Sequence, residues 1–187
     1  LGTARCDKTL KDAKALGVDK IARIDVSEGY LDSSSVQSML AEACKILDAE
    51  VVYCGKAAAD TNAGSTGPGV AEKLGWPSIA NVTNISFEEN SLELMQPSPD
   101  GQAKISVNLP VVVTCDKGIG EPRRANVKGI MMAKRAVVEI IDVGNFEGNT
   151  SVIEHSSPPQ KPPGKSYDGS EHVPEVVKLL RDEANII

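Results

Sequence analysis

Residues Val51–Gly75, VVYCGKAAADTNAGSTGPGVAEKLG, place an apolar strand, a loop of small residues and a punctuated helix in direct succession. Val51–Cys54 is a short β-branched and aromatic run, which favours a buried strand. Pro68 stands near the start of the expected helix Gly67–Leu74 and Gly75 follows its end, as is usual at the two ends of a helix. A strand, a loop and a helix in this order are typical of a parallel α/β sheet with crossover helices.

The segments on both sides extend this pattern and then change it. Upstream we expect a helix over Asp7–Leu16, a strand over Lys20–Val26 and a helix that Ser33–Ser35 caps and that runs to Leu47. Downstream, short turn-rich links separate three strands, which favours antiparallel pairing. The expected strands after Gly75 are Ala80–Phe87, Ser91–Gln96, Ala103–Asn108, Leu109–Cys115 and Val137–Asp142. The sequence therefore predicts a three-layer α/β fold with a mostly parallel sheet and an added antiparallel hairpin region.

Composition and charge exclude several classes of function. The net charge is −6 and aromatic residues make up 3% of the chain, which argues against a nucleic-acid surface. No apolar run is long enough to span a bilayer, so we expect no membrane insertion. The four cysteines show no metal-ligand spacing, which favours free thiols in a reducing compartment over a zinc site.

The chain is expected to hold one domain and one appended arm. Leu1 lies in a loop that enters a helix, whereas such sheets open on a strand, so we expect a first strand–helix unit to be missing from residues 1–143. The stretch from Gly144 to Gly169 is rich in Pro, Gly and Ser and predicts an extended arm, followed by a helix over Val173–Glu183. The arm and helix, residues 144–187, are expected to pack on a partner subunit, with packing on their own domain as the alternative.

The glycine-rich loop after Cys54 can bind an anion. It lies at the carboxyl end of a strand and before a helix N-terminus, where backbone N–H groups and the helix dipole favour phosphate. Neutral hydroxyl and amide groups could donate, and Asp60 could accept from a ribose hydroxyl. The loop lacks both common phosphate-loop patterns, so phosphate hydrolysis has no support. A flexible surface loop is the alternative.

The segment Asp116–Arg135, DKGIGEPRRANVKGIMMAKR, is predicted to be an exposed, charged loop that ends in a basic amphipathic turn. Its apolar Val127, Ile130 and Met131 could anchor a partner protein. A solvated loop that folds back on its own domain is the alternative.

Three motifs in order resemble the β subunit of electron-transfer flavoprotein. They are DKTLKDAKALGVDKI (Asp7–Ile21), GKAAADTNAGSTGPGVAEKLGWP (Gly55–Pro77) and LPVVVTCDKGIGEPRRANVKGIMMAKR (Leu109–Arg135), and PPQKPPG also matches the family's arm. The resemblance implies an adenine-nucleotide α-hydrolase-like fold and a non-catalytic subunit that pairs with an FAD-bearing α subunit. It also implies AMP, or a second FAD in electron-bifurcating members, bound in this subunit.

When the family's functional residues are matched to this sequence position by position, the resemblance implies two groups of residues. The nucleotide contacts would be Leu1, Gly55, Lys56, Ala57, Ala58, Ala59, Asp60, Thr61, Asn62, Ala63, Gly64, Ser65 and Thr66. The loop that docks flavin dehydrogenases, such as acyl-CoA dehydrogenases, would use Glu121, Pro122, Arg123, Val127, Ile130 and Met131, with Val127 as the anchor.

The nucleotide loop departs from the family motif at four positions. Ala58 and Ala59 replace Gln and Ile, and Asn62 and Ala63 stand where the bifurcating form has Asp and Thr. AMP and FAD therefore both stay open. Two other functions also stay open: a stand-alone ATP-using α/β enzyme, and a structural interaction subunit that has lost its nucleotide. For the compartment we expect bacterial or archaeal cytoplasm or the mitochondrial matrix, and both stay open because a transit peptide would lie in the segment that we expect to be missing.

Overall fold

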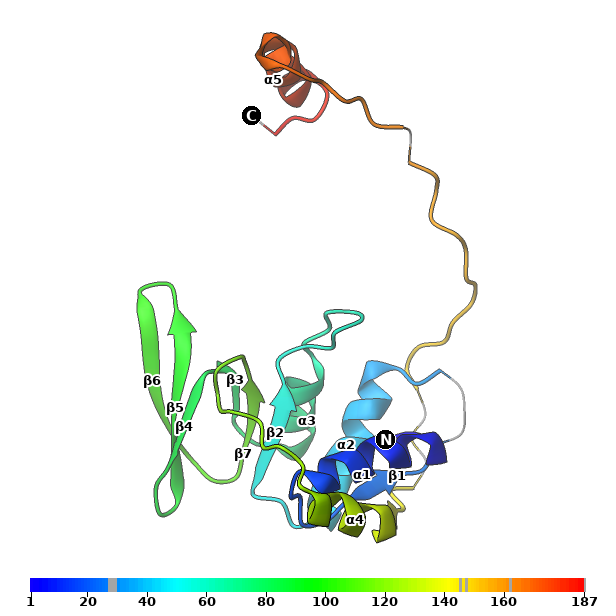
Figure 1. Cartoon of the computed structure of the whole chain (residues 1–187), viewed down its shortest axis with the longest axis vertical. Helices are drawn as coiled ribbons and strands as arrows, with labels where there is room; N and C mark the ends of the chain where they lie inside the picture. The colour runs from blue at the N-terminus through cyan, green and yellow to red at the C-terminus, as the bar shows by residue number, and fades with distance from the viewer. Residues whose placement is uncertain (27–29, 145, 147, 162, 187) are drawn as a thin grey trace. The chain divides into compact units, whose positions relative to one another are not determined.

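Three parallel strands form the sheet from which the glycine-rich loop after Cys54 leaves (Figure 1). In the computed structural model, which describes residues 1–26, 30–144, 146, 148–161 and 163–186, the strand order is β2 (Val51–Gly55), β7 (Val111–Cys115) and β3 (Ser78–Val82). The central strand β7 is buried from Val111 to Thr114. A continuous apolar run of this kind is typical of a parallel strand that is covered on both faces.

An antiparallel sheet covers one face of the parallel sheet. Its strands are β4 (Asn84–Phe87), β5 (Ser91–Ser98) and β6 (Gly101–Asn108), which are paired in that order. Leu92 and Leu94 of β5 are fully buried in one cluster with Val82, Val111 and Val113. Burial of each leucine side chain contributes about 1.5–3 kcal/mol, so these two residues fasten the hairpin region to the sheet.

The single strand predicted over Ala80–Phe87 is wrong, because the chain changes sheets within it. Asn81 has a left-handed φ of 56° and the pairing register of β3 shifts between Ile79 and Val82. The Thr83 N–H then donates to the carbonyl of Met95 at 2.9 Å, which starts the antiparallel sheet. The bulge redirects the chain, and β3 and β4 are separate strands.

Helices α2 (Ser33–Ile46) and α3 (Thr66–Leu74) pack against each other, and α3 lies on β2 and β7. A glycine permits the close approach of α3 to the sheet. A Cβ at Gly67 would lie 2.6 Å from Cγ2 of Thr114 in β7, whereas one at Gly69 would meet only the flexible carboxamide end of Gln37 in α2. Gly67 therefore allows this helix to sit against β7.

The start of α2 also differs from the prediction. The N-cap is Asp32, whose carboxylate accepts from the Ser35 N–H at 2.8 Å, and Ser33–Ser35 form the first turn instead of the cap. An ionised aspartate is as good a cap as serine and adds a charge that the helix dipole favours.

A second, two-stranded parallel sheet pairs β1 (Ala22–Ile24) with β8 (Glu139–Ile141). Ile24 and Ile141 pack against Met39 and Ala43 of α2 in a core of their own. The short helix η1 (Ala4–Cys6) leads into α1 (Asp7–Ala15). Buried Arg23 of β1 forms ion pairs with Asp25 and, at 2.8 Å, with Asp7. The pair with Asp7 holds the start of α1 against β1.

Residues Val127–Arg135 form a helix, α4, where the sequence predicted a loop that ends in a turn. The Asn126 carboxamide caps α4 by accepting from the Gly129 N–H at 2.7 Å. Helix α4 packs alongside α1 (Figure 1). Because Lys and Met are good helix formers, the capped stretch forms about two and a half turns.

The chain divides into two compact units, Leu1–Val152 and Ile153–Ile187. The second unit contains η2 (Ser170–His172) and α5 (Val173–Asp182), near the predicted helix Val173–Glu183. Residues 145, 147, 162 and 187 of the expected arm and terminal helix lie outside the described residues. The first unit has the predicted three-layer α/β class, with its parallel strands in two sheets and an added antiparallel sheet.

Candidate functional site

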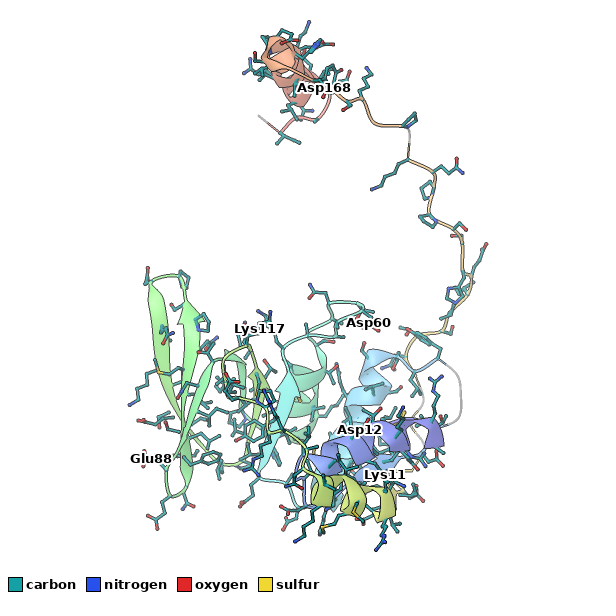
Figure 2. The ribbon with its side chains drawn as sticks, in the orientation of Figure 1. Lys11, Asp12, Asp60, Glu88, Lys117 and Asp168 are labelled. Carbon is teal, nitrogen blue, oxygen red and sulfur yellow. The ribbon has the colours of Figure 1, made fainter. Side chains whose placement is uncertain are left out.

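The glycine-rich loop, defined as Gly55–Thr66, leaves the carboxyl end of β2 and leads into α3. Every residue of this loop is exposed. Figure 2 labels Asp60 in the loop and Lys117 in the segment after β7, both beyond the carboxyl ends of these parallel strands. The loop therefore lies at the edge of the sheet where open α/β folds bind ligands.

The middle of the loop folds onto itself. The Ala58 N–H donates to the Ala63 carbonyl at 3.0 Å, and the Asn62 N–H donates to the Ala58 carbonyl at 2.9 Å. Asp60 accepts from the Thr61 N–H at 2.8 Å, and Asn62 adopts a left-handed φ of 55°. These backbone donors are used inside the loop, so the part that suits an anion is its end at α3.

The first turn of α3 suits a phosphate. Its N-cap residue, Ser65, makes no side-chain cap, so the leading N–H groups of the helix are not used by that side chain. The neighbouring Gly64 is exposed and carries no side chain that could obstruct an approaching anion. Gln37 of α2 donates to the Ser65 carbonyl at 3.1 Å and fixes the position of this turn. Uncapped N–H groups and the helix dipole together favour a negative charge here.

Lys56 is the one cation in the sequence of the glycine-rich loop. Its Nζ lies 2.9 Å from Oδ2 of Asp116, the first residue after β7. The hydrogen bond from Lys56 is the main cause that lowers the pKa of Asp116 from its ordinary value, so this carboxyl is ionised at neutral pH. Sequence reasoning missed Asp116 and Gln37 as neighbours of the loop. The signal that could have located Asp116 was its place directly after the expected buried strand Leu109–Cys115 of a mostly parallel sheet.

The predicted docking residues fall into separate groups. Glu121, Pro122 and Arg123 are exposed in an irregular segment before α4. Val127 and Met131, one helical turn apart, are 76% and 55% exposed.

With other residues of α4, Val127 and Met131 line a shallow hollow of about 490 Å³, defined here as the α4 hollow. Its other lining residues are Lys128, Met132 and Arg135. Met132 is 58% exposed and was not predicted from the sequence.

Ile130 faces a different cavity. It lines a groove of about 720 Å³ between α4 and α1, together with Leu16 and Ala133. Lys11 and Asp12, labelled on α1 in Figure 2, border the same groove. The packing of α1 beside α4 therefore places Ile130 in this groove, whereas Val127 and Met131 line the α4 hollow.

A family model described as "Electron transfer flavoprotein domain" matches residues 1–145. The chain belongs to the electron transfer flavoprotein β-subunit family. It is 31% identical to the "Electron transfer flavoprotein subunit beta" of Homo sapiens, over 95% of this chain and 72% of that protein. It is 29% identical to the subunit of the same name from Bacillus subtilis, over 100% of this chain and 77% of that protein.

Membership makes this β subunit part of an electron carrier rather than an enzyme, with an α subunit as its partner and a flavin in the complex. The alternative of a stand-alone ATP-using enzyme is therefore not supported. In the part of the chain that the structure describes, no group of His, Cys, Asp and Glu could hold a metal ion. Nor does any described helix have the length and apolar character needed to cross a membrane.

Three partly buried thiols of the β subunit are unsuited to nucleophilic chemistry. Burial raises the pKa of Cys44, Cys54 and Cys115 above the ordinary thiol value. They are protonated at neutral pH and thus poor nucleophiles.

Leu1 lies beside the β1 sheet of the β subunit. The Gly2 N–H donates to the Ile24 carbonyl at 3.0 Å, and Arg23 donates to the Gly2 carbonyl at 2.9 Å. These bonds hold the chain start at the carboxyl end of β1. Leu1, a predicted nucleotide contact, therefore lies on one parallel sheet, whereas the glycine-rich loop follows β2 of the other.

Proposed function

We propose that this β subunit holds a nucleotide, AMP or a second FAD, with a phosphate at the N-terminus of α3. Gly64, Ser65 and Thr66 would surround the phosphate, and Lys56 would supply a positive charge. Asp60 and the remaining loop residues would contact the sugar and base, and Leu1 would contribute through its backbone. The bound nucleotide would act as a structural group, while electrons pass through the FAD of the α subunit.

We also propose that the α4 hollow docks flavin dehydrogenases such as the acyl-CoA dehydrogenases of fatty acid oxidation. Val127 would be the apolar anchor, with Met131 beside it and Glu121, Pro122 and Arg123 at the rim. A small apolar centre with charged residues around it is the usual composition of a protein-binding hot spot. Docking there would bring the donor flavin to the complex, so that electrons reach the α-subunit FAD and move onward.

A single observation carries the nucleotide proposal: the uncapped first turn of α3 follows a loop of small residues with one lysine, at the carboxyl end of a parallel sheet. The test is to purify the β subunit with its α subunit, release the bound small molecules by heat, and identify them by chromatography. We expect one equivalent of AMP, or a second equivalent of FAD, for each β subunit. A complex that releases only the α-subunit FAD would contradict the proposal and favour a structural subunit that has lost its nucleotide.

The docking proposal is tested by the rate at which a reduced acyl-CoA dehydrogenase reduces the flavin of the complex. Replacing Val127 and Met131 together by Asp places charge in the hollow, and we expect the rate constant at limiting complex to fall by roughly tenfold or more. Phe87 of β4, 71% exposed and outside α4, provides the control as Phe87→Asp. Equal rates for the α4 double variant and the Phe87 variant would exclude this docking surface.

A further inference from the structure

The glycine-rich loop and the docking segment, defined as Asp116–Arg135, begin side by side. Gly55 of β2 pairs in register with Cys115 of β7, so Lys56 and Asp116 are the first residues beyond two neighbouring parallel strands. The Lys56 N–H donates to the Cys115 carbonyl at 3.1 Å, and the Asp116 N–H donates to the Val82 carbonyl at 2.8 Å. The backbones of both residues are thus fixed by the sheet, while their side chains extend beyond it.

The Lys56–Asp116 ion pair is a direct link between these two segments. Asp116 Oδ2 contacts Lys56, while its Oδ1 accepts from the Lys117 N–H at 2.8 Å, which shapes the first turn of the docking segment. The two side chains are 52% and 28% exposed, so solvent and ligands can reach the pair. The flexible four-carbon stem of Lys56 allows its ammonium group to turn from one anion to another.

We propose that Asp116 holds Lys56 while the nucleotide site is empty and releases it to the phosphate when a nucleotide binds, so that the occupancy of the site is coupled to the docking segment. This inference rests on the proposed nucleotide function and adds Asp116 to it as a positioning residue. Binding breaks one ion pair and forms another. Because an exposed ion pair is weak, the exchange alters affinity by only about two- to five-fold.

The coupling acts in both directions. A nucleotide that takes Lys56 frees the Asp116 side chain, and a docked partner that fixes the first turn after β7 changes the affinity of the nucleotide by the same factor. The fixed backbone of both residues confines the change to side chains and to the turn at Lys117. The fold itself is not required to move.

The test compares ligands that differ only in phosphate. Binding of AMP and of adenosine to the nucleotide-stripped complex with the α subunit is measured by calorimetry; if the site takes FAD, FAD and riboflavin replace them. Asp116→Asn is expected to raise the affinity for AMP by about two- to five-fold and to leave adenosine unchanged. Lys56→Gln lowers the affinity for AMP, and adding Asp116→Asn to it then has no further effect. Asp116→Glu keeps the carboxylate and should therefore keep the wild-type ratio of the affinities for the two ligands.

Glu93→Gln is the matched control, because it removes the same charge from a comparable cross-strand pair, Glu93–Lys104, at 2.8 Å on β5 and β6. It should leave both ligands unaffected. Hydrogen exchange at residues 117–120 should increase on addition of AMP to the wild type, and it should already be fast in Asp116→Asn.

The possible outcomes separate the two proposals. A wild-type complex that binds neither ligand pair overturns the nucleotide function and this inference with it. A wild type that binds AMP, with Asp116→Asn affecting AMP and adenosine equally or weakening AMP, overturns the exchange and leaves the nucleotide function standing.

Discussion

At the scale of single residues, Asp32 joins two distant parts of the chain through one carboxylate. Its side chain is buried and accepts from the N–H of Ser35 at 2.8 Å, of Asn149 at 2.6 Å and of Thr150 at 3.0 Å. The bond from Ser35 is the main cause that lowers the pKa of Asp32 from 3.8 to about 2. The ionised form is therefore favoured by the folded state.

This pKa predicts how stability depends on pH. A carboxyl whose folded pKa is depressed contributes stability that is present above its unfolded pKa near 4 and is lost as the pH falls toward 2. The urea midpoint of the wild type should decrease over this window, and Asp32→Asn should show a lower midpoint at neutral pH and a flatter decrease. Unfolding curves measured from pH 6 to pH 2 provide the check.

Asp100→Asn, in the exposed β5–β6 turn, is the control for the loss of a carboxyl and should keep the wild-type dependence on pH. If Asp32→Asn kept the full pH dependence of the wild type, the role assigned to Asp32 would be incorrect.

At the scale of elements, the contact between α1 and α4 depends on one glycine. A Cβ at Gly129 would lie 2.6 Å from the backbone carbonyl oxygen of Ala15. The intrinsic preference for Ala over Gly in a helix, about 1 kcal/mol, would favour substitution. The clash opposes it, because a backbone atom cannot move aside as a flexible side chain can.

We therefore expect Gly129→Ala to destabilise the protein by about 1–3 kcal/mol, the usual cost of overpacking, despite the gain in helix propensity. Urea unfolding at neutral pH measures this change in free energy. Lys128→Ala, at the exposed neighbouring position of α4, is the matched control and should change stability little. A Gly129→Ala protein as stable as the control would show that α4 is not closely packed on α1.

The sequence was sufficient to predict those elements for which local signals and tertiary structure agree. The strand, loop and helix of Val51–Gly75 follow from an apolar run and from Pro and Gly punctuation, and the structure has β2 and α3 there. The two long strands β5 and β6 likewise follow from the turn between them. Periodicity and turn chemistry identify elements of this kind without knowledge of their neighbours.

The sequence was insufficient to predict features that depend on strand pairing and helix packing between distant parts of the chain. The bulge at Asn81 and the change of sheets at Thr83 depend on pairing with β7 and β5, which local propensity does not encode. Asp116 becomes a neighbour of Lys56 only through the β2–β7 register. In the same way, the roles of Ile130 and Met131 separate only once α1 lies beside α4.

At the scale of the whole molecule, the two units differ in how they bury apolar surface. The unit Leu1–Val152 has two apolar cores, whereas α5 in the second unit buries none of its residues. Val173, Val176, Val177 and Leu180 follow one another at helical spacing, which gives α5 an apolar stripe. A helix of ten residues with such a stripe gains most of its stability from packing against another surface.

We propose that the α subunit supplies this surface, and the proposal predicts that Val177→Gln and Leu180→Gln in α5 weaken the α–β complex. Each change removes apolar contact area from a short interface helix, so a loss of roughly tenfold in affinity is expected for the pair. Sedimentation of the co-purified subunits over a dilution series measures the dissociation constant. Lys178→Gln, on the charged side of α5, should keep the wild-type constant. The opposite outcome would be a double variant that retains full affinity for the α subunit but lowers the thermal stability of the isolated chain. In that case α5 would pack on its own domain, because the same apolar stripe would be buried within one subunit.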